Sequence, residues 1–231
     1  MLLAFETSAK AASVALFQGD KLLGESYQNT GLTHSQTLLK MAEDLLKNCG
    51  ATVNDLTDVA VAAGPGSFTG VRIGVAAAKG LAWGKALPCW GVSTLEAMAM
   101  GLGVQDGYVL ATMDARRGQV YTALFSAKNG IISRVFDDSA IALTELKERI
   151  AKLEQPIFLV GDGSTLTYNT LKEDVPALIL PPEYKMHQRA VGVGLAAFSA
   201  IAQGEAGNAE TLSPNYLRLS QAERERLEKT K

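Results

Sequence analysis

The sequence predicts a two-lobed α/β protein in which each lobe repeats a three-strand meander followed by helices. Short apolar segments alternate with stretches of helical periodicity along the whole chain of 231 residues. In addition, Glu6 is followed nine to eleven residues later by Ala-Leu-Phe, and Asp114 is followed by the same tripeptide at the same offsets. Such a duplication typically places two similar lobes across a cleft, with the acidic residues at its edge.

The first lobe is expected to span residues 1–103. Apolar runs separated by turn residues predict its opening meander, at residues 2–5, 13–17 and 21–27. Thr33 and Gln36 fit a capping box that begins a helix ending near residue 49. The other expected elements alternate between strand and helix, at residues 56–63, 71–84, 89–92 and 93–102.

Closely spaced glycines near residue 103 mark the boundary to a second lobe, expected over residues 104–216. Asn129-Gly130 predicts a hairpin turn in this lobe. The expected strands lie at residues 108–114, 119–125, 131–136 and 157–160, and the expected helices at residues 144–153, 164–172 and 186–203. Residues 217–231 form a charged C-terminal tail, which we expect to be a solvated helix.

The bulk composition is that of an ordinary globular protein, with 47% hydrophobic residues and a formal net charge of −2. A chain with this charge is a poor stand-alone binder of nucleic acid, although it could contribute to a composite site. Two cysteines without a CxxC pair indicate a reducing compartment. We find neither a signal-peptide pattern at the N-terminus nor an apolar run long enough for a membrane, so we expect a cytoplasmic location.

The most conspicuous motif is GPGSFTGVRIG at residues 64–74, between an apolar strand and a helix of small residues. Its spacing fits neither a Walker A loop nor the Rossmann fingerprint. Two interpretations remain open. The helix N-terminus, with Ser67 or Thr69 as its cap and Arg72 in its first turn, could bind an anion. Alternatively, the glycines let the chain turn sharply and pack against the sheet, which the spacing favours.

Small residues recur every four positions along the helix that follows, at Gly70, Gly74, Ala78 and Ala82. Glycine inside a helix costs about 0.5–1 kcal/mol relative to alanine, so a close approach of another backbone must offset that cost. The partner backbone is either the protein's own sheet or a helix of another subunit, and the sequence does not separate these two.

Residues that could carry chemistry are few. The two histidines, His34 and His187, lie far apart, and the sequence contains no metal-ligand spacing and no G-x-S-x-G motif. We therefore expect no dedicated metal site. Glu6 and Asp114 stand at strand ends, where a base or a ligand for a metal-bound phosphate would lie, although most such residues are structural.

Several motifs together closely resemble one family, the TsaB (YeaZ) proteins of bacteria. They are LLAFETS, the HSQ–LL helix, GPGSFTGVRIG, GVSTLEA, DARRGQVY, GDG and PNYLR, which follow in family order over nearly the whole chain. The resemblance implies an actin-like, ribonuclease-H-like fold. It also implies a non-catalytic relative of TsaD, the subunit that transfers threonylcarbamoyl to the adenosine beside the anticodon of tRNAs reading A-starting codons.

The resemblance also implies how such a subunit assembles. TsaD-like proteins hold a metal with an HxxxH pair. Here His34 matches the first histidine, but Leu38 stands at the position of the second. Family members pair with TsaD, or with themselves, through their first two helices, and an ATPase, TsaE, joins the assembly. The implied partner interface comprises Thr33, His34, Leu38, Met41, Leu45, Gly70, Gly74, Ala77, Ala78, Leu81 and Ala82.

The cleft of this chain departs from that of actin-like ATPases. The first phosphate loop has no glycine, and two arginines, Arg116 and Arg117, separate the acidic residue from the glycine in the second loop. We therefore expect no cofactor and no strong ATP binding. The residues of such a degenerate nucleotide or anion site would be Glu6, Thr7, Ser8, Ser67, Thr69, Arg72, Asp114 and Asp162.

Three functional hypotheses follow from the sequence. The first is a scaffold subunit that reaches tRNA only indirectly, through TsaD. The second is an autonomous enzyme of the actin-like fold, either a nucleotide-dependent phosphotransferase or a glycoprotease-like peptidase. The third is a homodimer acting as an interaction module. Arg116, Arg117 and the tail are candidates for direct tRNA contact, with a solvated charged surface as the alternative.

Overall fold

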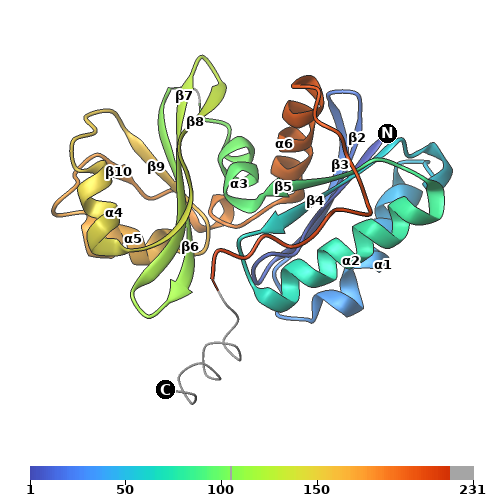
Figure 1. Ribbon diagram of the computed structural model, residues 1–231, viewed down its shortest axis with the longest axis horizontal. Coiled ribbons are helices and arrows are strands. Elements are labelled where there is room, and N and C mark those ends of the chain that lie inside the picture. The colour runs from blue at the N-terminus through green and yellow to red at the C-terminus, as the bar shows by residue number, and fades with distance from the viewer. Residues whose placement is uncertain (105, 219–231) are drawn as a thin grey trace.

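Two five-stranded sheets lie side by side in the computed structural model, which describes residues 1–104 and 106–218 (Figure 1). The first sheet has the strand order β3-β2-β1-β4-β5, built from β1 (Leu2–Glu6), β2 (Ala12–Gln18), β3 (Lys21–Gln28), β4 (Asp58–Gly64) and β5 (Cys89–Ser93). The second has the order β10-β9-β6-β7-β8, built from β6 (Gly107–Arg116), β7 (Gln119–Lys128), β8 (Ile131–Ala142), β9 (Ile157–Val160) and β10 (Leu178–Ile179).

The two sheets repeat one topology. In each, the first strand pairs antiparallel with the second and parallel with the fourth. The predicted duplication is thereby confirmed. The Ala-Leu-Phe signal is displaced by one residue between the lobes, because Ala15 pairs with Ala4 whereas Ala123 pairs with Ala111, one residue further from the acidic residue. A bulge near the end of β6 accompanies this displacement.

Alternation along the strands divides the first lobe into two cores. Leu3 and Phe5 of β1 point to one face, where they meet α1 (His34–Asn48) and α2 (Phe68–Lys85). Leu2 and Ala4 point to the other face, which α6 (Ala190–Ala202) covers. The first sheet is therefore buried on both sides.

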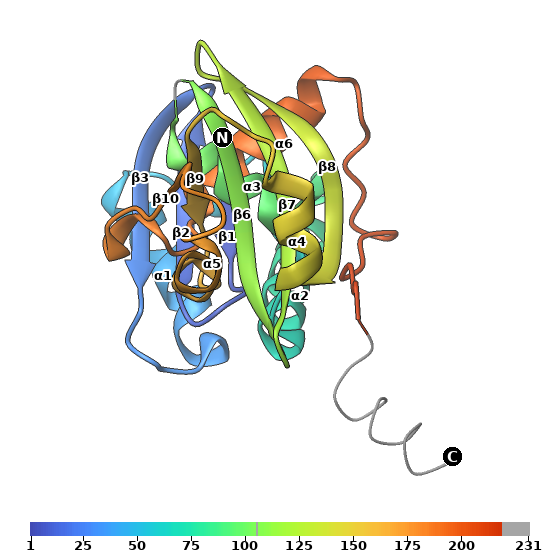
Figure 2. The same ribbon diagram turned by 90° about the vertical axis from the view of Figure 1, so that its left-hand side faces the viewer.

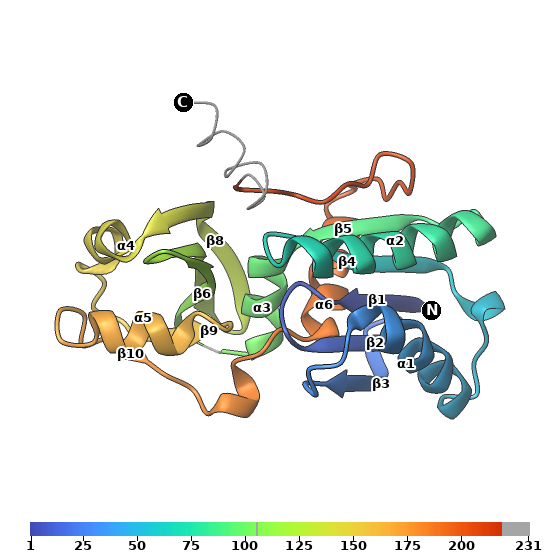
Figure 3. The same cartoon turned by 90° about the horizontal axis from the view of Figure 1, so that it is seen from below.

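The second lobe has a similar layered arrangement. Helix α3 (Thr94–Leu102) lies between the two sheets and packs on α6 and β6 (Figure 3). Helices α4 (Leu143–Ile150) and α5 (Ser164–Leu171) cover the outer face of the second sheet (Figure 2). Two short 3-10 turns, η1 (Val53–Asp55) and η2 (Glu183–Lys185), complete the described elements.

One expected assignment is corrected by the packing. The sequence placed residues 104–216 in the second lobe, but α6 contacts β1, β2 and β4 of the first sheet. The segment after α6 also returns to the first lobe, where the Asn215 N–H donates to the carbonyl oxygen of Ala63 at 2.6 Å. Periodicity identifies an apolar helix but not the sheet that it covers, so sequence order was misleading here. The expected tail helix falls almost entirely on residues outside those described.

Some helix ends also differ from expectation. Thr33 precedes α1 but forms no side-chain capping hydrogen bond, so the predicted capping box is wrong. Thr52 and Asp55 form one instead at the start of η1. Ser93 caps α3 by accepting from the Glu96 N–H at 3.2 Å, while the Glu96 carboxylate pairs with Arg134. Among residues 1–104 and 106–218, no helix has both the length and the apolar character needed to cross a bilayer.

Candidate functional site

The glycine motif after β4 supports the turn that follows β1. A Cβ at position 70 would overlap the carbonyl oxygen of Thr7, and one at position 66 would overlap the carbonyl oxygen of Ser8. The Ser67 N–H donates to Ser8 O at 2.6 Å, and Ser67 caps α2 by accepting from the Gly70 N–H at 3.3 Å. Close backbone packing therefore explains these glycines, as the spacing favoured.

The small-residue stripe of α2 faces the protein's own sheet. A Cβ on Gly74 would overlap the Thr7 hydroxyl. Ala78 and Ala82, further along α2, are fully buried on the face of the helix that packs on the core. Packing on the chain's own strands therefore explains the small residues of this stripe without a second subunit. The expected interface residues buried in this way are Leu38, Met41, Leu45, Gly70, Gly74, Ala78 and Ala82. Those that remain at least partly accessible are Thr33, His34, Ala77 and Leu81.

Glu6 ends β1 and is only 1% exposed. Its Oε1 accepts from the Ser8 N–H at 2.5 Å, and its Oε2 has no hydrogen-bond partner among the described residues. The pKa of the Glu6 carboxyl is raised from 4.5 to about 7, mainly by burial and to a smaller extent by the nearby Asp162 carboxylate, against the opposing effect of the hydrogen bonds from Ser8. Glu6 is therefore partly protonated at neutral pH.

The acidic residues of the second lobe lie near Glu6 in the interlobe region. Asp162 follows β9, and its Oδ1 accepts from Gln188 Nε2 at 3.2 Å. Burial raises the pKa of the Asp162 carboxyl, with the Asp114 carboxylate as a smaller cause in the same direction. Asp114 itself is exposed, and its Oδ1 accepts from the Arg116 N–H at 2.6 Å. Glu6 is thus fully buried, whereas solvent reaches both aspartates.

A cavity of about 540 Å³ lies between the lobes. Five residues of the expected nucleotide or anion site line it, namely Ser8, Ser67, Thr69, Asp114 and Asp162. Glu6, Thr7 and Arg72 are not part of its lining. The Thr7 hydroxyl donates instead to the carbonyl oxygen of Gly70, and Arg72 donates to the hydroxyl of Tyr216. The expected set is therefore only partly brought together around one space.

The C-terminal segment forms a wall of this cavity that sequence reasoning did not anticipate. Tyr216 stacks on Phe68 with ring centroids 4.3 Å apart, and Arg72 Nε donates to the Tyr216 hydroxyl at 2.8 Å. The Arg72 guanidinium also lies 3.9 Å from the centroid of the Phe68 ring. Further along, Arg218 donates to the carbonyl oxygen of Ala115 in the second lobe. Residues 214–218, the PNYLR motif, and the glycine motif are thus packing partners, which neither motif reveals alone.

The histidine of α1, His34, is held by the turn between β1 and β2. Nε2 of His34 donates to the carbonyl oxygen of Ala9 at 2.7 Å, and Leu38, one helical turn later, is buried in the core. Among the residues described, no three His, Cys, Asp or Glu side chains come together in a way that could hold a metal ion.

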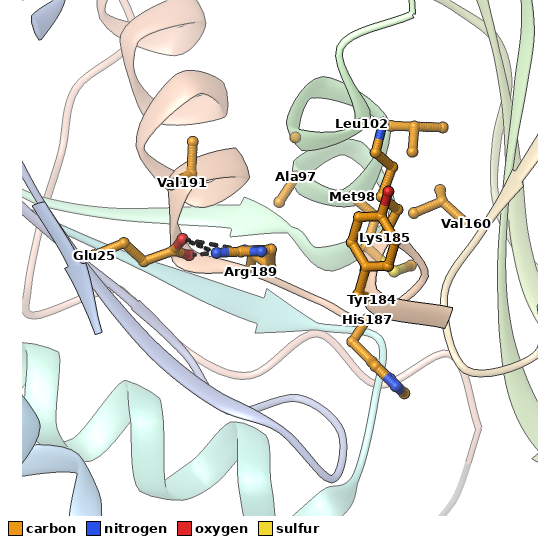
Figure 4. A pocket seen from close by; sticks show the side chains of 11 residues that line it. Glu25, Ala97, Met98, Leu102, Val160, Tyr184, Lys185, His187, Arg189 and Val191 are labelled. Carbon is orange, nitrogen blue, oxygen red and sulfur yellow. Dashed lines mark hydrogen bonds and ion pairs between the residues drawn. The ribbon is translucent and has the colours of Figure 1, made fainter. Parts of the chain in front are cut away.

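A second interlobe cavity, of about 340 Å³, lies between β3, α3 and the crossover that leads to α6 (Figure 4). Arg189 and Glu25 form an ion pair on one side of it, facing Tyr184 and Lys185 on the other. The Ser13 hydroxyl donates to Glu25 at 2.9 Å, which ties this pair to the first sheet. This cavity was not predicted from the sequence, because its residues come from distant segments.

An apolar groove of about 490 Å³ runs between α1 and α2. Its walls include Leu39, which is 61% exposed, together with Ala42, Leu46 and Leu81. The core residues Leu3 and Phe5 form its floor. Single exposed apolar side chains are common on a monomer surface, whereas contiguous apolar patches such as this groove typically mark an interaction site.

Comparison with known proteins gives the same family from several directions. The family model "TsaD: tRNA N6-adenosine threonylcarbamoyltransferase" matches residues 28–226. The tRNA threonylcarbamoyladenosine biosynthesis protein TsaB of Bacillus subtilis is 33% identical over 232 residues, covering 100% of this chain and 99% of that protein. The TsaB protein of Escherichia coli is 35% identical over 220 residues, covering 94% of each chain.

Solved structures agree with the sequence relatives. YeaZ from Pseudomonas aeruginosa is 29% identical, with a TM-score of 0.78 over 94% of this chain and 99% of that one. Component A of the (R)-2-hydroxyglutaryl-CoA dehydratase of Acidaminococcus fermentans is 13% identical with a TM-score of 0.51, a likeness of fold alone. The predicted two-lobed actin-like fold is confirmed by these neighbours and by the repeated sheet topology.

Proposed function

This chain belongs to the TsaB family, and from that premise we propose that it serves tRNA threonylcarbamoyladenosine biosynthesis as a non-catalytic scaffold subunit. In this proposal it binds a TsaD-type catalytic subunit, and a TsaE-type ATPase joins the pair. Within that assembly, in the cytoplasm, it acts on tRNA only indirectly, through the catalytic subunit. In the absence of a partner it forms a homodimer through the surface that otherwise binds the TsaD-type subunit.

The observation that carries the proposal is the apolar groove between α1 and α2. Leu39 is 61% exposed on one side of it, and Trp83 is 66% exposed near the end of α2. Leu81 lies in the groove between the two helices. A helix pair from a second molecule would bury these side chains, which favours association by the hydrophobic effect. In this proposal the interface is the apolar groove between α1 and α2, together with the exposed side chains beside it, rather than the buried stripe of small residues in α2.

Two residues support the non-catalytic part of the proposal. Leu38 occupies the position where TsaD-like proteins place the second histidine of their metal-binding pair, and it is buried in the core. Glu6 is only 1% exposed and does not line the large cavity, so it is poorly placed to act on a substrate there.

An autonomous enzyme of the actin-like fold is the second candidate, and one observation favours it. A carboxyl with a pKa near 7, such as that of Glu6, is suited to general acid–base catalysis. A conformational change that opened the interlobe region would be needed to bring Glu6 to a substrate, because it is only 1% exposed.

The test compares two substitutions of exposed apolar residues by aspartate. Leu39→Asp places a charge in the groove, whereas Ile131→Asp places one on the second lobe, where the side chain is 70% exposed. We expect Leu39→Asp to weaken binding to a TsaD-type partner at least about tenfold, the equivalent of roughly 1.4 kcal/mol, in calorimetry. Ile131→Asp should bind as the unaltered protein does.

Light scattering of each variant alone should show the same difference in homodimer formation. Unchanged association of Leu39→Asp would exclude the groove as the interface. ATP turnover by the purified chain alone, lost in Glu6→Gln, would favour the enzyme over the scaffold.

A further inference from the structure

The hairpin that joins β6 to β7 has an unusual turn. Arg117 and Gly118 stand at its two central positions with φ of 56° and 71°, and Arg116 before them has φ of 65°. Positive φ at both central residues defines the tight hairpin turn that favours Asn-Gly. An arginine in the left-handed region is disfavoured, because its Cβ crowds the following carbonyl oxygen.

The next hairpin of the same sheet provides an internal comparison. Its turn is Asn129-Gly130, with φ of 52° and 77°, the residue pair that this geometry prefers. Two turns of the same kind in one sheet therefore use different residues. Arg116 and Arg117 are both exposed, so core packing does not account for them. Strain at an exposed turn is a feature of sites that bind something.

The arginine turn lies at the rim of the large interlobe cavity. Arg116 lines that cavity together with Lys10 from the β1–β2 turn and Arg218 from the C-terminal segment. Figure 1 shows the C-terminal segment and the β6–β7 hairpin reaching the same side of the molecule. Cationic side chains from three distant parts of the chain thus meet around one opening, although the whole chain has a formal net charge of −2.

An aromatic surface adjoins these cations. Tyr216 lines the cavity and is 40% exposed, even though it stacks on Phe68. Arg72 fixes the orientation of this ring by donating to its hydroxyl. An exposed ring beside cationic side chains is the combination that binds nucleic-acid strands, with bases stacked on the ring and phosphates on the cations.

We propose that this rim, comprising Lys10, Arg116, Arg117, Tyr216 and Arg218, is a direct contact surface for RNA. The cationic side chains would bind the phosphodiester backbone, and Tyr216 would stack with an unpaired base. The inference rests on the proposed function in one respect, since it takes the RNA to be the tRNA on which the assembly acts. It goes beyond that function by assigning to this chain a contact that the scaffold role leaves to the catalytic subunit.

Two acidic residues also line the cavity, and each carboxylate accepts a hydrogen bond from within the chain. Oδ1 of Asp114 accepts from the backbone N–H of Arg116, which holds the arginine turn in place. Oδ1 of Asp162 accepts from Nε2 of Gln188. The cavity lining thus carries three cationic side chains, Lys10, Arg116 and Arg218, against these two carboxylates.

The experiment uses the substitution Arg117→Asn in the full chain. Asparagine suits the turn, so the variant should be at least as stable to heat as the unaltered protein. It should bind an unmodified tRNA transcript that reads A-starting codons about 3–10-fold more weakly, and the slope of log affinity against log salt should fall by about 1. Lys128→Asn removes the same charge beside the Asn129-Gly130 turn and should change neither quantity.

Binding is measured by fluorescence anisotropy, for the chain alone and for its complex with a TsaD-type partner. Loss of RNA affinity with undiminished thermal stability and an intact complex would support the proposal. Equal affinity and equal salt slope for Arg117→Asn and the unaltered protein would overturn it, as would equal competition by AMP at matched nucleotide concentration, which indicates a mononucleotide site. If no complex with the TsaD-type partner forms, the scaffold function is excluded. The RNA contact would still be supported in that case, provided that the chain alone binds RNA and Arg117→Asn weakens that binding.

Discussion

The side-chain hydroxyl of Thr7 donates a hydrogen bond of 2.8 Å to the carbonyl oxygen of Gly70. This contact joins the turn after β1 to the first turn of α2, over 63 residues of sequence. The glycine motif therefore serves the packing of the first lobe, and the N-terminus of α2 is partly occupied by the protein's own Ser8 and Thr7.

The two helical glycines Gly70 and Gly80 should respond in opposite directions to alanine. Gly70→Ala should lower the free energy of unfolding by about 3 kcal/mol, because the new Cβ overlaps the carbonyl oxygen of Thr7. Gly80→Ala should raise it by about 0.5–1 kcal/mol, because nothing lies within 4 Å of its Cβ position and alanine favours the helix. Urea denaturation measures both values. Similar stability of the two variants would mean that Thr7 does not approach α2 as described.

Glu6 should make the stability depend on pH. Its pKa is about 7 in the folded state against an ordinary value of 4.5, so between these values the folded protein binds more protons than the unfolded chain. The free energy of unfolding should therefore fall as pH rises from about 4.5 to about 7, by up to about 3 kcal/mol. Glu6→Gln should remove most of this dependence in denaturation series at several pH values. A variant with the same pH profile as the unaltered protein would exclude Glu6 as its source.

Ser13 should be essential for the start of α6. Its buried hydroxyl donates to Glu25 and accepts from the Ala190 N–H at 2.8 Å. Ser13→Ala would leave that buried N–H without a partner, at a cost of about 1–3 kcal/mol in unfolding free energy. Ser26→Ala, on the neighbouring strand β3, is a control with no such contact. Hydrogen exchange at the first amides of α6 should accelerate only in Ser13→Ala.

Tyr216 should hold the C-terminal segment against the first lobe. Tyr216→Ala removes its stacking on Phe68 and its hydrogen bond with Arg72, together about 1–2 kcal/mol. Tyr216→Phe keeps the stacking and should lose only about half as much. Exchange of the Asn215 amide, which donates to Ala63, reports the local opening. No difference between the alanine and phenylalanine variants would show that the ring contributes nothing.

The sequence was sufficient to predict the repeated architecture. The short apolar segments and the paired positions of Glu6 and Asp114 led to two sheets of like topology, since apolar runs and short turns are local properties. The ends of the first helix were predicted correctly, but the capping hydrogen bond expected at Thr33 is absent. Whether a side chain caps a helix depends on which other segments accept hydrogen bonds from the backbone N–H groups of its first turn. The sequence of the helix alone does not specify those segments.

The candidate site was predicted only in part, because contacts between distant segments decide it. Ser67, one of the two cap residues that the sequence left open, caps α2, which is a local feature. The packing of Tyr216 on Phe68 was not predicted, since nothing in PNYLR indicates that it packs on a motif far earlier in the chain. The stripe from Gly70 to Ala82 left two interpretations, and only the position of Thr7 distinguishes core from interface.

The return of α6 to the first sheet has a consequence for biosynthesis. The strands of that sheet are complete once residue 93 has left the ribosome, but their inner face, with Leu2, Ala4 and Ala60, waits for residues 190–202. At about 5–20 residues per second, this sheet has one apolar face uncovered for roughly 5–20 seconds. The nascent chain is thus most prone to aggregation while its second half is being translated, and the folding of α6 onto the first sheet ends that period.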